Sequence, residues 1–77
     1  MIPIAQINQF LQSTLSIKEQ KNTTAIEAAR WLDAVELLKD SESRPGLPLR
    51  NLLREGRIDG QRQENNNRWY IERIEHK

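Results

Sequence analysis

The chain has 77 residues, a net charge of +1 and no cysteine, and 30% of its residues are charged. This length suffices for one domain with a modest core and leaves no room for a separate substrate domain. The lack of cysteine excludes disulfides and thiolate metal ligands and fits a cytoplasmic protein. No apolar run is long enough to cross a bilayer, and the N-terminal residues do not resemble a secretion signal, so we expect no membrane association.

Charge divides the chain into two unlike halves. Residues 1–43 carry four basic and six acidic groups, whereas residues 44–77 carry eight basic and five acidic groups. In the second half every basic residue except Lys77 is arginine, whose planar guanidinium suits phosphates and guanine edges. The net charge alone does not indicate a nucleic acid, and arginines also decorate ordinary solvated surfaces. The asymmetry is suggestive of DNA binding but not specific for it, so charge alone leaves both interpretations open.

The first segment, Pro3 to Leu15, is predicted to form an amphipathic helix. Proline is favoured in the first turn of a helix, and apolar residues recur at spacings of three and four, namely Ile4, Ile7, Phe10 and Leu11. The polar positions between them are expected mostly to face solvent, namely Gln6, Asn8, Gln9 and Gln12. The polar stretch from Ser16 to Thr23 is predicted to be a loop.

The second helix has the clearest start in the sequence. Thr24-Ala25-Ile26-Glu27 has the pattern of a capping box, in which the threonine hydroxyl accepts from the N–H three residues on. Alanines at positions 25, 28 and 29 favour the helix, and their small size lets a neighbouring helix approach closely. We expect the helix to run from Ala25 to Ala34, while Val35 to Lys39 could extend it or form a separate short turn.

A turn-rich connector, Asp40 to Gly46, leads to the third helix. Pro48 suits the first turn of this helix, which is predicted from Pro48 to Glu55, and Gly56 suits its left-handed C-terminal cap. The buried face is predicted to consist of Leu49, Leu52 and Leu53. Another face is expected to carry Arg50, Arg54 and, beyond the cap, Arg57.

The remainder is predicted to be a β-hairpin. Arg57 to Gln63 is expected to be extended, residues 64–67 to form the turn, and Arg68 to Ile74 to return as a strand of high β-propensity. Because an isolated hairpin is only marginally stable, Trp69 and Ile71 are expected to pack on the helices. Both Trp31 and Trp69 are predicted to contribute to the core, since a small domain needs their area.

These elements, in this order, predict an α+β domain with three helices followed by a C-terminal β-hairpin, as in a small winged helix-turn-helix. We expect a single domain over residues 1–77. Its parts are an N-terminal helix and loop (1–22), a helix-turn-helix (23–56) and a wing (57–74).

Three stretches resemble the excisionase and MerR-like helix-turn-helix families. Thr24-Ala25-Ile26-Glu27-Ala28-Ala29, followed by Trp31-Leu32, is similar to the start of the first helix of their motif. Arg50 to Ile58 resembles the end of their recognition helix, and Arg68 to Ile71 resembles the return strand of the wing. The resemblance covers about residues 23–74, although those families join the two helices by a shorter turn than Ala34 to Leu47. It implies binding to double-stranded DNA.

The third helix is expected to enter the major groove, where arginine pairs with guanine and asparagine with adenine. Its candidate base-contacting residues are Arg50, Asn51 and Arg54. The N-terminus of this helix is expected to offer N–H groups to a phosphate, with Arg44 alongside. Contacts from the wing to phosphate or the minor groove are assigned to Arg62 and Arg68, and Arg57 completes the candidate DNA-binding set.

Two functions stay open at this stage. The first is sequence-specific binding of double-stranded DNA by a small transcriptional regulator or an excisionase-like factor, with dimerisation or cooperative self-association compensating for a small surface. The second is a winged-helix adaptor that binds protein and not DNA, which the low net charge and the acidic first half favour.

An enzyme is not expected, and neither is a metal, a cofactor or a small-molecule substrate. The glycines are too few and too scattered to form a phosphate-binding loop. The single histidine, His76, lies in the C-terminal tail and is assigned no role. The clustered acids are assigned to a solvated face, namely Asp33, Glu36 and Asp40.

Overall fold

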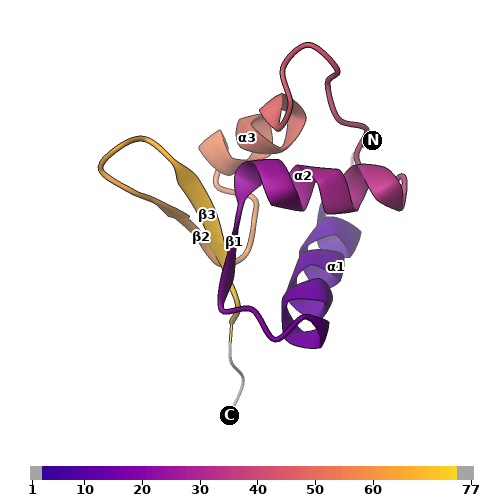
Figure 1. Cartoon of the computed structure of the whole chain (residues 1–77), viewed down its shortest axis with the longest axis vertical. Coiled ribbons are helices and arrows are strands. Elements are labelled where there is room, and N and C mark those ends of the chain that lie inside the picture. Colours follow the sequence, from indigo (N-terminus) through magenta and orange to yellow (C-terminus); the bar gives the residue numbers. More distant parts are fainter. Residues whose placement is uncertain (1–2, 75–77) are drawn as a thin grey trace.

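A computed structural model describes residues 3–74 of the chain. Within this range the elements follow the order α1 (Ile4–Ile17), β1 (Asn22–Thr24), α2 (Ala25–Ala34), α3 (Leu47–Arg54), β2 (Gln61–Gln63) and β3 (Trp69–Glu72). Figure 1 shows the helices gathered beside a small antiparallel sheet, with the loop between β2 and β3 projecting away from them. The predicted α+β fold with a helix-turn-helix and a wing is confirmed.

The first helix, α1, is the predicted amphipathic helix but ends two residues later than expected, at Ile17. Its buried stripe consists of Ile7, Leu11 and Leu15. The helix ends in a Schellman motif, in which Glu19 takes a left-handed φ of 55° and the Gln20 N–H donates to the Leu15 carbonyl at 2.9 Å. Glycine or asparagine usually marks this position, so a glutamate there gave no signal in the sequence.

The strand β1 lies in a segment that the sequence analysis assigned to a loop. It pairs antiparallel with β3 in the register Asn22↔Glu72, Thr23↔Ile71 and Thr24↔Tyr70. Thr23 is buried while its two neighbours are exposed. Three residues are too few to show an alternating pattern, and the segment becomes a strand only because β3 lies beside it.

The second helix begins and ends where the sequence predicts. The Thr24 hydroxyl accepts from the Glu27 N–H at 3.2 Å, which confirms the threonine half of the capping box. The helix ends at Ala34 because Glu36 takes a left-handed φ of 60° and the Leu37 N–H returns to the Leu32 carbonyl. Val35 to Lys39 therefore forms a turn and does not extend the helix.

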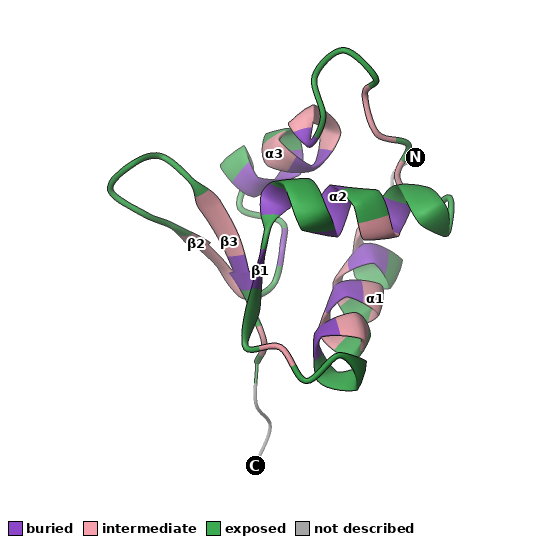
Figure 2. Ribbon diagram, viewed as in Figure 1, coloured by how far each residue is buried: buried purple, intermediate pink, exposed green. Residues whose placement is uncertain are grey.

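The core lies between the three helices and the inner face of the sheet. Figure 2 shows the buried positions as stripes on the facing sides of α1, α2 and α3. The largest completely buried side chains include Leu32 of α2, Leu49 and Leu53 of α3, and Ile71 of β3. Trp31 and Trp69 are partly buried and pack against this core, as predicted.

The sheet has β3 at its centre, in the order β1-β3-β2. The wing strand β2 is shorter than predicted, because only Gln61–Gln63 pairs with β3. Residues 57–60 form a turn instead of a strand: Ile58 is 3% exposed in the core, and Gly60 has a φ of +82°. A turn that sends one apolar side chain inward cannot continue the alternation of a strand. Among residues 3–74, no helix combines the length and the apolar character that crossing a membrane requires.

Candidate nucleic-acid interface

The third helix is anchored by its leucines and presents polar side chains on the rest of its surface. Leu49, Leu52 and Leu53 are 0%, 3% and 0% exposed. Asn51 and Arg54 are exposed on the outward side of the helix, together with the partly exposed Leu47 at spacings of four and three. The predicted burial of the three leucines, on which the candidate recognition surface depends, is confirmed.

A groove separates α3 from the wing, and cationic side chains line it. Its two adjoining hollows share Arg50, Asn67 and Trp69. One hollow extends past Arg68 to the first residues of α2, and the other is completed by Arg54 and Gln63. We call this surface the α3–wing groove, lined by Arg50, Arg54, Gln63, Asn67, Arg68 and Trp69. No acidic residue of the described part of the chain lines either hollow.

Arg50 occupies the inner wall of this groove. The residue is partly buried, and its Nε atom is buried with no hydrogen-bond partner within residues 3–74. Neither Arg50 nor Arg54 forms an ion pair with an acid in the described range. A buried, unpaired donor on a charged group costs free energy. Arg50 therefore contributes a positive charge to the groove that no acid of residues 3–74 pairs with.

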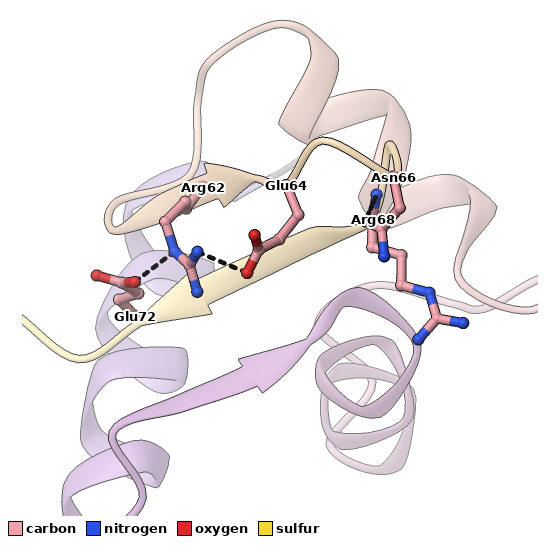
Figure 3. Close-up of polar contacts among 5 residues, drawn as sticks. All are labelled: Arg62, Glu64, Asn66, Arg68 and Glu72. Atoms are coloured by element: carbon pink, nitrogen blue, oxygen red, sulfur yellow. Dashed lines mark hydrogen bonds and ion pairs between the residues drawn. The ribbon is translucent and has the colours of Figure 1, made fainter.

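The two wing arginines have different surroundings, although the sequence analysis treated them alike. Arg62 stands opposite Tyr70, on the outer face of the sheet, and its guanidinium lies 5.2 Å from the centre of the Tyr70 ring. Glu64 and Glu72 lie on the same face, two positions along β2 and β3 respectively. Arg62 Nη1 lies 2.7 Å from Glu64 Oε1, and Arg62 Nε lies 2.5 Å from Glu72 Oε1 (Figure 3).

These pairs hold Arg62 as a charged group inside the wing. The hydrogen bond to Glu64, helped by the neighbouring negative charges, raises the pKa of the Arg62 guanidinium above its ordinary value despite some desolvation. Its Nη1 donates a hydrogen bond to Glu64, and its Nε lies within ion-pair distance of Glu72. The hairpin structure therefore gives Arg62 a partner other than the predicted phosphate.

Arg68 is exposed at the other side of the wing turn, and its side chain extends away from the hairpin in Figure 3. Its backbone is held in place: the Arg68 N–H donates to Asn66 Oδ1 at 3.1 Å, and the Arg68 carbonyl accepts from the Glu64 N–H at 2.9 Å. Its guanidinium makes no ion pair with an acid among residues 3–74. Arg68 therefore presents an unpaired charge to the α3–wing groove from a fixed backbone.

Arg57 and Arg44 lie outside the groove lining. Arg57 Nε lies 3.7 Å from Glu55 Oε1, with both side chains more than half exposed. Arg57 also belongs to the turn after α3, since its N–H donates to the Leu52 carbonyl. Arg44 is exposed in the connector before α3, and its carbonyl accepts from the Leu47 N–H.

The N-terminus of α3 is not open to a phosphate in the way the sequence suggested. Asp40 Oδ1 accepts from the Gly46 N–H at 2.8 Å, the Leu47 N–H is bonded to the connector, and Pro48 has no N–H. The chain's own carboxylate therefore occupies the positive end of the helix. An incoming phosphate there would meet the negative charge of Asp40, which makes this helix end less favourable for the expected phosphate contact.

The structure adds groove residues that sequence reasoning missed. Gln63, Asn67 and Trp69 line the groove beside the arginines. The two amides carried no signal because they are uncharged: Gln63 lies in a polar strand and Asn67 in a polar turn. Trp69 was assigned to the core alone. His76 lies outside the described residues. Comparisons with protein-family models, with curated proteins and with solved structures found no match to this chain.

Proposed function

We propose that the chain binds double-stranded DNA, with α3 in the major groove and the wing on the adjoining backbone. The dimensions support this: an α-helix with its side chains is about 10–12 Å across, which fits a B-DNA major groove about 12 Å wide, and α3 has 8 residues. On the outward side of α3, Asn51 and Arg54 are the residues best placed to reach base edges.

The observation that carries the proposal is the α3–wing groove itself. Arg50, Arg54 and Arg68 line it from two separate elements, none is paired with an acid in the described range, and no acid lines it there. We assign Arg50 and Arg68, on facing sides of the groove, to the phosphates of one strand. Arg62 is left out of this set, because it already forms ion pairs with Glu64 and Glu72.

The resemblance of residues 23–74 to excisionase and MerR-like proteins is consistent with this function. A small transcriptional regulator or an excisionase-like factor, acting in the cytoplasm, fits both lines of argument. One domain of this size offers a limited DNA surface, so two copies on adjacent half-sites would raise affinity and specificity.

The test is a titration of a fluorescent random-sequence duplex with the protein, followed by anisotropy at two salt concentrations. We expect binding at low salt that weakens as salt rises, because phosphate contacts release counterions. Arg50→Ala and Arg54→Ala should each weaken binding and leave the circular dichroism melt unchanged. Arg30→Ala is the matched control, since Arg30 is exposed on α2, away from the groove, and carries the same charge.

Two results would contradict the proposal. If no binding is detected at low salt, the rival function, a protein-binding adaptor, takes its place. If Arg30→Ala weakens binding as much as Arg50→Ala and Arg54→Ala do, the groove is not the contact surface. Selection of bound duplexes from a random pool would then measure sequence specificity, which Asn51→Ala should relax at one base position.

A further inference from the structure

Two amide side chains on α1 tie the first helix to the base of the wing. Asn8 and Gln12 lie one helical turn apart and are both partly buried, although the sequence analysis expected them mostly to face solvent. Their neighbours Gln6 and Gln9 are exposed, as expected. The two inward-facing amides must therefore have partners on another element.

Asn8 holds the turn that connects α3 to β2. Its Nδ2 donates to the Arg57 carbonyl at 3.1 Å, and its Oδ1 accepts from the Asp59 N–H at 3.0 Å. Both ends of one side-chain amide are thus bonded to backbone groups two residues apart. The turn is fixed relative to α1 at the point where the chain leaves α3.

Gln12 bridges that same turn and the end of the central strand. Its Nε2 donates to the Asp59 carbonyl at 3.3 Å and to the Glu72 carbonyl at 3.0 Å, and its Oε1 accepts from the Ile74 N–H at 2.8 Å. Here the chain is tightly packed: a Cβ at Gly60 would lie 2.2 Å from the Glu72 oxygen and 3.1 Å from Gln12 Nε2. Gln12 therefore fixes the end of β3 and the turn before β2 against α1, next to the residues at which β3 pairs with β1.

The wing acts as a lever on this base, and β1, which pairs with residues 70–72 of β3, turns with it. Ile74 and Arg68 are six positions apart, which in a strand corresponds to about 20 Å. A rotation of about 10° at the base would move the far end by about 3.5 Å, more than the length of a hydrogen bond. Arg68 lines the groove at that far end. A small rotation of the wing at its base would therefore remove the contact of Arg68 with a phosphate.

We propose that Asn8 and Gln12 are positioning residues for DNA binding: they set the orientation of the wing relative to α3 and never touch the DNA. This inference rests on the proposed function for its effect on affinity. The orientation itself is a property of the free protein and is measurable without DNA. The positioning role of the two amides and the proposed DNA binding can therefore be refuted separately.

The experiment compares Gln12→Met, which keeps the length of the side chain and removes its hydrogen-bonding groups, with Gln9→Met on the exposed side of the same helix. Residual dipolar couplings of backbone amides give the orientation of the β2–β3 hairpin relative to the helices. Anisotropy titrations at about 50 mM salt then give the affinity for duplex DNA, alone and combined with Arg68→Ala or Arg54→Ala. Asn8→Ala, which removes only the two bonds to the turn, replaces Gln12→Met if that variant does not fold.

We expect Gln12→Met to rotate the hairpin and to weaken DNA binding by about threefold or more, with no change for Gln9→Met. In the Gln12→Met background, Arg68→Ala should cost little further affinity, whereas Arg54→Ala should cost as much as in the unmutated protein. A merely destabilising effect would not produce this difference between the two arginines.

An unchanged hairpin orientation would overturn the inference, and so would a full Arg68→Ala penalty in the Gln12→Met background. If the unmutated protein binds no duplex, the proposed function fails, and the role in DNA binding fails with it. The couplings still decide, in that case, whether the two amides orient the wing.

Discussion

The two arginines of the wing provide a sharp test, because they carry the same charge on the same hairpin but have different partners. Arg68 is unpaired within the described range and lines the groove, whereas Arg62 is held by Glu64 and Glu72. Replacing either by alanine lowers the net charge by one. We predict that Arg68→Ala weakens DNA binding in a salt-dependent way and that Arg62→Ala leaves the affinity nearly unchanged.

The size of the effect follows from counterion release. Each phosphate contact contributes about 0.9 to the slope of log affinity against log salt. A fourfold rise in salt, from about 50 to about 200 mM, therefore costs about 3.5-fold in affinity for each contact. If Arg68 makes one such contact, the penalty for Arg68→Ala should be about 3.5 times larger at the lower salt concentration than at the higher one.

The assay is fluorescence anisotropy with a labelled duplex at four or more salt concentrations, which gives the slope for each variant. The slope of Arg68→Ala should be shallower by about 0.9 than that of the unmutated protein, and the slope of Arg62→Ala should not change. Equal losses of slope in both variants would show that overall charge attracts the DNA, and would refute a specific contact by Arg68. An unchanged slope in Arg68→Ala would refute it directly.

Three further predictions concern the scaffold, each measured by urea denaturation. Leu53→Ala should lower the free energy of unfolding by about 2–5 kcal/mol, because it leaves a cavity in the core. Leu47→Ala, on the outward side of α3, should lower it by much less. Equal losses would mean that the leucine face does not anchor the helix. Gly60→Ala should cost more than Gly56→Ala, because a Cβ meets the Glu72 carbonyl at the first position and open space at the second. Thr24→Ala should lower the free energy of unfolding by about 1 kcal/mol, because the cap of α2 is lost. An unchanged free energy of unfolding would contradict a stabilising role for this hydrogen bond.

Sequence patterns predicted the elements whose determinants are local. The capping hydroxyl of Thr24 lies three residues from the N–H it accepts from, so α2 begins where it was expected. The spacing of Leu49, Leu52 and Leu53 specifies one face of a helix wherever that helix lies. By contrast, two helix ends that depend on glutamates in left-handed conformations were missed or left open, because glutamate carries no preference that marks such a position.

The candidate site was predicted as a set of residues but not as a surface. Arg50 and Arg54 were expected to share a face, and both line the groove. Arg62 and Arg68 could not be distinguished in the sequence, since only the pairing of β2 with β3 brings Glu72 beside Arg62. The same holds for the N-terminus of α3, where the connector brings Asp40 back to Gly46, six positions further along the chain.

The sequence by itself determined the helical faces, the cap of α2, the wing turn and the concentration of arginine in the second half, because each depends on residues a few positions apart. Tertiary structure alone decided which groove arginines have no acidic partner among residues 3–74, that Asn22–Thr24 forms a strand, and that Asn8 and Gln12 are bonded to the base of the wing. Those features join groups separated by up to 62 residues. Local sequence patterns carry no information about such contacts, because the contacts form only when the chain folds and brings distant residues together.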